Sequence, residues 1–186
     1  MKGETHFLIG ANTAWLFTLF ESHIIAINPL VLPIMGGFTA LLPDLDAEHS
    51  KIKYIKLKDV QLFAPFAELT SRAFGHRGFL HSFLACLIFT LLIGILAAIF
   101  RISWLVPLAA FFGYLSHLVA DTLSGKGIPW LYPNRRRFVI LSKLRRYNSG
   151  LPDSLSSHFL EELIFWLSAF GLLLFLFRYE LYELIA

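Results

Sequence analysis

Residues Phe79–Leu123 read FLHSFLACLIFTLLIGILAAIFRISWLVPLAAFFGYLSHLVADTL and contain two long apolar stretches, Phe79–Phe100 and Trp104–Leu123. A helix needs about 20 mostly apolar residues to cross the hydrocarbon core of a bilayer, which is about 30 Å thick. Both stretches have that length, and only a short connection that contains Arg101 separates them. The sequence therefore predicts two membrane-spanning helices here.

Three further apolar segments lie outside this region. Ile24–Leu42 and Phe159–Phe177 are long enough to span, whereas Phe7–Phe20 is shorter and contains the polar pair Asn12–Thr13. Phe7–Phe20 is therefore either a first span or a helix that lies in the membrane interface. We expect an all-α membrane helix bundle of about five spans, built as a single membrane-embedded domain over residues 1–186.

The composition supports an integral membrane protein. Hydrophobic residues make up 56% of the chain and charged residues only 16%, whereas soluble domains carry about 45–50% apolar and about 25% charged residues. This excludes a disordered chain and a soluble nucleic-acid-binding domain, and the lone Cys86 excludes a disulfide scaffold. The start, MKGETHF, is followed by no small-residue cleavage site, so we expect the apolar segments to remain in the mature protein.

Positive charge gathers on one side of the predicted bundle. With five spans, Lys2 and the long loops Pro43–Gly78 and Ser124–His158 share a side that carries all but Arg101 and Arg178 of the 16 lysines and arginines. Basic residues mark the cytoplasmic side of membrane proteins. We therefore expect a cytoplasmic N-terminus and an external C-terminus, and we interpret the net charge of +3 as membrane orientation rather than direct contact with nucleic acid.

Ionisable residues cluster at the same, cytoplasmic, end of each predicted span. Such groups at membrane depth cost several kcal/mol unless they are paired, hydrated or bound to a cation, so they are candidates for function. His6 joins the set if Phe7–Phe20 crosses the membrane. The other members, span by span, are Asp44 and Asp46; His76, Arg77 and His81; His117 and Asp121; and His158, Glu161 and Glu162.

The spacing of these residues indicates a metal site. His117 and Asp121 are four residues apart, which places both on one helical face, and His158 and Glu162 repeat this spacing. Histidine and carboxylate together offer mixed N/O ligands to zinc, manganese or iron. A site with two metals about 3.5–4 Å apart needs a bridging carboxylate, which Asp121 is placed to supply.

Each motif also has a structural interpretation. The His117–Asp121 pair could be a hydrogen-bonded pair, and the Asp44–Asp46 pair could end a helix. His76 and His81 could be interfacial, with His81–Ser82 simply starting a helix. The sequence hardly separates Glu161 from Glu162 as a ligand. The clustering of all these groups on one side favours the metal site.

The ordered motifs THFLIG, LPDLD, GHRGFLHS, SHLVADTLSGKGIPWLYP and EEL cover nearly the whole chain. In this combination the chain resembles the YdjM-type family of bacterial and archaeal inner-membrane, metal-dependent hydrolases, some of which are described as LexA-binding. That family is in turn distantly similar to zinc-dependent phospholipases C and single-strand nucleases, which use a trinuclear zinc site. The resemblance implies two or three zinc ions, with manganese or iron as alternatives.

The resemblance also implies the ligands. Here His158 completes an HxxxE motif like that of the phospholipases, but this motif is not expected throughout the YdjM-type family. The soluble enzymes coordinate metal with a processed N-terminal amine, whereas this chain starts at Met1 and departs from them at this ligand of the third metal. The implied metal ligands are His6, Asp44, Asp46, His76, His81, His117, Asp121 and Glu162.

The expected reaction is hydrolysis of a phosphoester by metal-activated water. Asp44 or Asp46, whichever does not bind metal, would accept the proton of the water. Arg77 would clamp the phosphate, and Lys126 would assist with less geometric precision. A site that opens at the membrane surface favours membrane lipids, with a lipid headgroup or lipid-linked phosphate as substrate.

Other functions fit less well. The motifs HExxH, GxSxG and GxxxxGK[ST] are absent, and a transporter would place its ionisable groups near the bilayer midplane. The rival hypothesis is a non-catalytic scaffold or anchor that binds a cytoplasmic regulator protein and carries a structural metal site. A catalytic metal site keeps an open coordination position, whereas a structural site is closed.

Overall fold

The computed structural model describes residues 1–19, 28, 30–46, 56–57, 60–61, 78–123, 127–134, 136–139 and 153–185. Helices dominate these residues: α1 (Gly3–Trp15), α2 (Val31–Thr39), α4 (Phe83–Ile99), α5 (Leu105–Leu123) and α7 (Asp153–Ile185), with the short 3-10 helices η1 (Leu16–Leu19), η2 (Leu42–Asp46) and η4 (Phe79–His81). The strands β1 (Lys56–Leu57) and β2 (Val60–Gln61) pair antiparallel and have two residues each. The predicted all-α class is confirmed.

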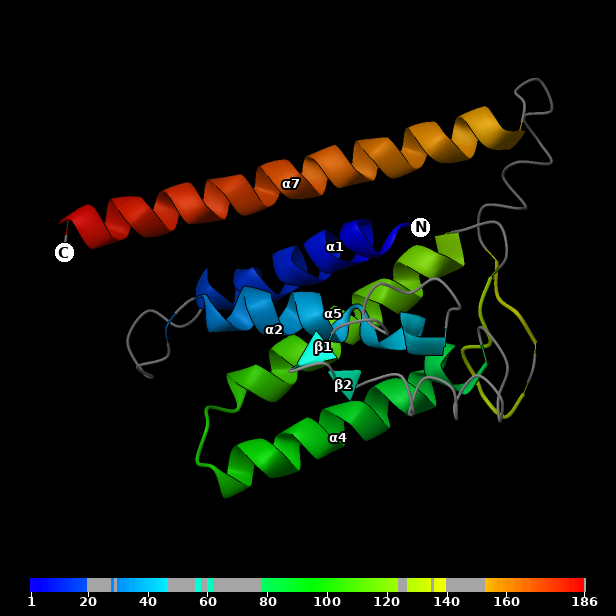
Figure 1. Ribbon diagram of the computed structural model, residues 1–186, viewed down its shortest axis with the longest axis horizontal. Helices are drawn as coiled ribbons and strands as arrows, with labels where there is room; N and C mark the ends of the chain where they lie inside the picture. The colour runs from blue at the N-terminus through cyan, green and yellow to red at the C-terminus, as the bar shows by residue number, and fades with distance from the viewer. Residues whose placement is uncertain are drawn as a thin grey trace.

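The bundle is built around α5. Helices α1, α2 and α5 pack against one another, α4 packs on α5, and α7 lies along α1 at the opposite edge of the molecule (Figure 1). Fully buried alanine and leucine side chains fill the space between α1, α2 and α5, among them Ala14, Leu32 and Ala109. Helix α5 therefore contacts α1, α2 and α4 and lies at the centre of their packing.

Three glycines allow α1, α2 and α5 to approach closely. A Cβ atom added at Gly36 would collide with the Cβ atom of Ala14 and the carbonyl oxygen of Gly10. A Cβ atom added at Gly113 would collide with the carbonyl oxygen of Gly36. Small residues allow close contact between helix backbones, and van der Waals packing of this kind drives helix association in membranes.

We expect Gly36→Ala to destabilise the bundle by about 1–3 kcal/mol, because the added methyl group overpacks the contact between α1 and α2. Thermal unfolding of the detergent-purified protein measures the effect. Gly94→Ala is the matched control, since a Cβ atom there meets only Pro107 at an ordinary 3.9 Å. A Gly36→Ala variant as stable as the Gly94→Ala variant would show that this close approach is not needed.

Within the described part of the predicted span Ile24–Leu42, which is residues 28 and 30–42, helix α2 covers Val31–Thr39. Nine residues are helical, and the chain then turns through η2. Pro33 is tolerated because it stands in the first turn, where backbone N–H groups have no partner within the helix. Pro43 lies in η2 itself, so Asp44 projects from a turn instead of extending the helix.

Helix α4 begins as one of the alternatives expected, with Ser82 as its N-cap. The Ser82 hydroxyl oxygen accepts a hydrogen bond from the backbone N–H of Ala85 at 3.2 Å. The residue before it, His81, ends η4 and is fully buried. His81 therefore stands at a helix start and also lies inside the bundle.

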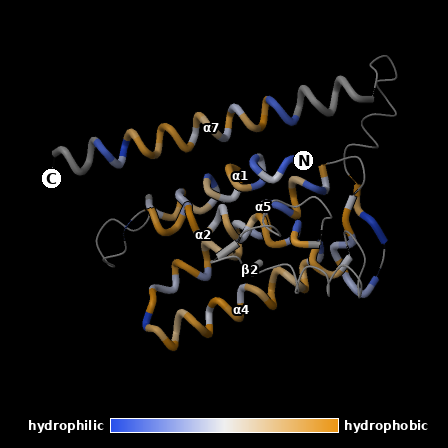
Figure 2. Tube along the Cα trace, in the orientation of Figure 1, coloured by the Kyte–Doolittle hydropathy of each residue, from blue (hydrophilic) through white to orange (hydrophobic). Residues whose placement is uncertain are grey.

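Two helices among the described residues are long and apolar enough to cross a membrane: α5 and the Glu161–Glu180 part of α7. Helix α4 is apolar but has 17 residues. Apolar residues run along α4 and the middle of α7, and hydrophilic residues stand near both ends of the apolar part of α7 (Figure 2). Five spans and the side on which each terminus lies stay predictions.

Candidate metal centre

Five of the predicted metal ligands converge at one end of the bundle. His6 comes from α1, Asp44 from η2, His81 from η4, and His117 and Asp121 from α5. All are fully buried except Asp44, whose side chain is 22% exposed. Residues that are far apart in the sequence thus form one buried cluster of imidazoles and carboxylates.

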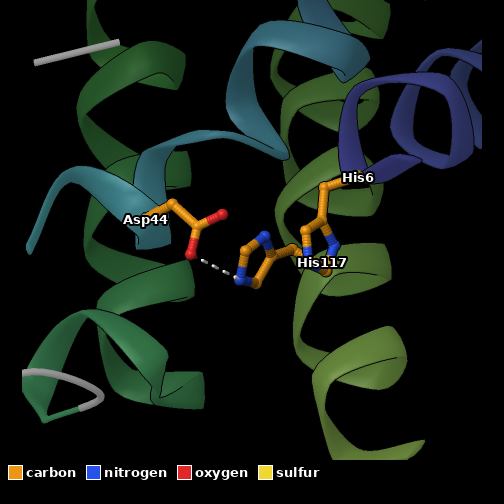
Figure 3. Close-up of side chains that lie close together, drawn as sticks. All are labelled: His6, Asp44 and His117. Carbon is orange, nitrogen blue, oxygen red and sulfur yellow. Dashed lines mark ion pairs between the residues drawn. The ribbon is translucent and has the colours of Figure 1, made fainter. Parts of the chain in front are cut away.

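The fold fixes the orientation of His117. Its Nδ1 atom lies 2.7 Å from the carbonyl oxygen of Ala40, which can only accept a hydrogen bond, so Nδ1 carries the proton. The lone pair of Nε2 then faces the cluster. The ring also stacks on His6, with centroids 3.8 Å apart, and Asp44 points toward it from η2 (Figure 3). A histidine held through its other nitrogen in this way is typical of metal ligands.

The potential ligand atoms are spaced as a metal site requires. The Nε2 atom of His81 lies 3.4 Å from Nε2 of His117, 3.8 Å from Oδ1 of Asp44 and 3.7 Å from Oδ2 of Asp121. The Nε2 atom of His117 lies 3.9 Å from the same Asp44 oxygen and 4.0 Å from the same Asp121 oxygen. Ligands on one tetrahedral zinc are about 3.4 Å apart, given bonds of about 2.0–2.1 Å. Inward shifts of a few tenths of an ångström would bring the atoms of His81, His117 and Asp121 to that spacing, and Asp44 belongs to a second group of neighbouring ligand atoms, with His6 and His117.

His6 extends the cluster on the other side of Asp121. Its Nε2 atom lies 3.4 Å from Oδ1 of Asp121, so the two carboxylate oxygens of Asp121 face different histidines. Among the described residues, neither ring nitrogen of His6 has a hydrogen-bond partner. His6 thus meets Asp121 at ion-pair distance but makes no hydrogen bond to a described residue, and a buried polar group without a hydrogen bond is costly. The site therefore fits a divalent cation, which would satisfy the imidazole.

Asp44 is the most solvent-accessible member of the cluster. Burial raises the pKa of its carboxyl above the usual value, and the nearby imidazoles of His6 and His81 partly offset this rise. A bound cation would favour the ionised carboxylate in the same way as a neighbouring positive charge. Asp44 marks the side on which the described residues leave the cluster open.

Two aromatic residues brace the elements that carry the ligands. The Tyr114 hydroxyl donates to the carbonyl oxygen of Leu80, next to His81, at 2.5 Å. The indole N–H of Trp130 donates to Oγ1 of Thr122, next to Asp121, at 2.7 Å. The carbonyl oxygen of Trp130 in turn accepts from the N–H of Phe83 at 3.0 Å, which ties the start of α4 to the end of α5.

Sequence reasoning missed this bracing role. Trp130 stands in the motif GIPWLYP, but the aromatic excess of the chain was better explained by interfacial belts. Tyr114 stands three residues before His117 in GYLSH, within an apolar run that indicates only packing. The motif GIPWLYP was the available signal for Trp130, because it follows the predicted ligands His117 and Asp121 closely in the chain.

The structure leaves other predicted site residues apart or outside the described residues. Asp46 ends η2, but its side chain is not among those described, and His76, Arg77 and Lys126 lie outside the described residues. Glu162 lies on α7 with an exposed side chain and is not among the histidines and carboxylates whose ligand atoms lie within 4.8 Å of one another. Its neighbour Glu161 accepts a hydrogen bond from the backbone N–H of Lys2. The side chain of His158 is not described.

Comparisons with known proteins place the chain among inner membrane proteins. It is 41% identical to the inner membrane protein YdjM of Escherichia coli (strain K12) over an alignment of 108 positions, and the match covers 54% of this chain and 48% of that protein. The Shigella flexneri protein of the same name matches equally. The chain therefore covers about half the length of these relatives.

A more distant relative matches over more of the chain. The YvsG protein of Bacillus subtilis (strain 168) is 26% identical over 137 residues, covering 74% of this chain and 76% of YvsG. No solved structure matches the chain. The family model described as YdjM inner membrane protein matches residues 1–182, so this chain belongs to the YdjM family of inner membrane proteins.

Proposed function

We propose that this chain is a membrane-bound, metal-dependent hydrolase that acts on a phosphoester at the cytoplasmic face of the membrane. The observation that supports it most is the buried cluster of three histidines and two aspartates, in which His6 has no hydrogen-bond partner among the described residues. Ionisable groups placed at the end of a membrane span are candidates for function by default. The mixed imidazole and carboxylate set suits zinc, manganese or iron.

The cluster offers ligands for two ions. His81, His117 and Asp121 would hold one, and His6 would hold the second together with the other oxygen of Asp121. Asp44, which lies close to His6 and His117, is a further ligand if it does not serve as the base. Ions bound there would polarise a phosphoryl oxygen and lower the pKa of a water molecule to about 7. Asp121 thus becomes the bridging carboxylate.

Two aspartates and two basic residues would supply the remaining chemistry. Asp44, partly exposed and held between His81 and His117, would accept the proton of the attacking water, or Asp46 would do so if Asp44 binds metal. Arg77 would hold the phosphate through paired hydrogen bonds, and Lys126 would add a second positive charge. The lysines and arginines of the two long loops, which adjoin the ligand-bearing segments in the sequence, would draw anionic lipids to the membrane face that carries the site.

The proposed topology has five spans, with the N-terminus in the cytoplasm and the C-terminus outside. It follows from the lysines and arginines of the two long loops. A reporter fused after Glu21 tests it. A reporter active outside the cytoplasm agrees with five spans, and a cytoplasmic signal there would contradict them.

Lipid hydrolysis by purified protein tests the proposed activity. The zinc- or manganese-loaded protein is assayed on phosphatidic acid, a phosphomonoester, and on phosphatidylglycerol, a phosphodiester, in mixed micelles. We expect release of phosphate or headgroup by the wild type, none by Asp121→Ala, and full activity in Glu180→Gln, which alters an exposed carboxylate at the far end of α7. Metal-loaded wild type that is inactive on both lipid classes would overturn the proposal.

We expect Trp130→Phe to weaken metal binding about 10- to 100-fold, the usual cost of losing a partner that orients the ligands. The variant keeps an aromatic ring but loses the indole N–H that holds Thr122 beside Asp121. Competition with a coloured chelator measures the affinity. Trp166→Phe is the control, since Trp166 is 67% exposed on α7. Equal affinities in the two variants would show that the Trp130 hydrogen bond does not orient the site.

A further inference from the structure

An apolar groove of about 510 Å³ lies between α1, α5 and α7. Its volume falls within the range of about 300–1,000 Å³ typical of ligand sites. Val119 of α5 and Leu167 of α7 line it and are 46% and 62% exposed, so the groove opens sideways to the surroundings of the bundle. In a membrane protein those surroundings are lipid.

The walls of the groove are chemically similar to hydrocarbon. Most lining side chains are aliphatic or aromatic. The hydroxyls of Thr13 and Ser116 donate back to carbonyl oxygens of their own helices, those of Gly10 and Gly113. These two hydroxyls are thus already satisfied. Ser168 is the third hydroxyl residue of the lining, and the apolar majority of the walls suits an alkyl chain better than a polar ligand.

The length of the groove matches one leaflet of a bilayer. On α5 it runs from Phe112 to Leu123, which at about 1.5 Å per residue is about 16 Å. Half of the hydrocarbon core of a bilayer is about 15 Å. Two of the three helices around the groove, α5 and α7, include candidate spans, so in a membrane the groove would lie at the depth of lipid chains.

The groove and the metal centre share two helices. On α5, Ser116 and Ala120 line the groove and directly precede His117 and Asp121 in the chain. On α1, Ile9 lines the groove three residues after His6. The Leu123 end of the groove therefore lies at the end of the bundle that carries the cluster.

We infer that this groove binds one hydrocarbon chain of a membrane phospholipid and thereby brings the lipid's phosphate to the metal centre. The second half of this inference rests on the proposed hydrolase function. The first half depends only on the groove and is tested separately.

Photocrosslinking tests the binding of the chain. Wild-type protein is placed in phosphatidylglycerol vesicles that contain a small fraction of phosphatidylglycerol with a diazirine on one acyl chain, and the crosslinked residues are mapped by mass spectrometry. We expect crosslinks concentrated on the groove segments of α1, α5 and α7, reduced several-fold by the groove-filling variant Ile164→Trp. Leu163→Trp is the matched control, because Leu163 is next to Ile164 in the chain but its side chain is 44% exposed and does not line the groove.

The outcomes distinguish binding of the hydrocarbon chain from delivery of the phosphate to the metal centre. Crosslinks that spread evenly over the exposed apolar faces of α4 and α7, and that are unchanged in Ile164→Trp, would overturn the groove as a binding site. Leu167→Trp replaces Ile164→Trp if that variant does not fold.

An activity assay tests delivery of the lipid. If the wild type hydrolyses lipid, Ile164→Trp should lose activity on long-chain phosphatidic acid several-fold while keeping its activity on water-soluble p-nitrophenyl phosphate. Equal loss on both would overturn delivery of the lipid. Absence of hydrolysis in the wild type counts against the proposed function, and localised crosslinks would still support the groove.

Discussion

His117→Ala is expected to abolish metal binding and to destabilise the protein by about 3 kcal/mol. The ring is fully buried, stacks on His6 and donates to the carbonyl oxygen of Ala40. Its removal leaves a cavity, which costs about 2–5 kcal/mol for large-to-small changes, and leaves a buried carbonyl oxygen without its donor. Metal content and thermal unfolding of the detergent-purified variant measure the two effects.

Leu118→Ala separates metal loss from loss of stability. Leu118 is the next residue on α5 and is also fully buried, so its truncation also leaves a cavity but removes no candidate ligand. We expect Leu118→Ala to lose stability and to keep its metal. A His117→Ala variant that binds metal as tightly as Leu118→Ala would contradict the role given to His117.

Removal of the metal by a chelator is expected to lower the thermal midpoint of the wild type by about 10 °C. A ligand that binds only the folded state stabilises it by about 4 kcal/mol at a thousandfold excess over its Kd, and a chain of this size gains about 2–4 °C per kcal/mol. The physical source is the cluster itself, in which Asp44 and Asp121 lie within 4.0 Å of the same histidine nitrogen. Differential scanning calorimetry before and after dialysis measures the shift.

Readdition of zinc or manganese should restore the midpoint. Leu118→Ala should show the same metal-dependent rise from a lower starting point, whereas Asp121→Ala should show none. A wild-type midpoint that is the same with chelator and with metal would mean that no ion contributes to the folded state.

Much of the fold could be predicted from the sequence because apolar length and helical periodicity are local properties. The expected segments Phe79–Phe100 and Trp104–Leu123 contain α4 and α5. In the described part of the expected segment Ile24–Leu42, the helix α2 ends at Thr39 and the chain turns through η2, which contains Pro43. Hydropathy alone does not predict where the backbone turns.

The ligands on one helix were also predictable, since four-residue spacing places His117 and Asp121 on one face. The groups that surround these two side chains are set by tertiary packing. The Ala40 carbonyl that orients His117 lies 77 residues away in the chain and carries no side-chain signature. Likewise, nothing local distinguishes Glu161 from Glu162, although the structure leaves the former half-buried beside Lys2 and the latter exposed.

The most direct measurement of the central claim is the metal content of the purified protein. Elemental analysis is run on wild type, Asp121→Ala and Glu180→Gln, each prepared without chelator and reloaded with zinc or manganese. The account predicts about two ions per chain in the wild type and in Glu180→Gln, and their loss in Asp121→Ala, because Asp121 faces His6 with one oxygen and His81 with the other. A wild type that stays metal-free, or an Asp121→Ala variant that keeps the full complement, would contradict the metal centre.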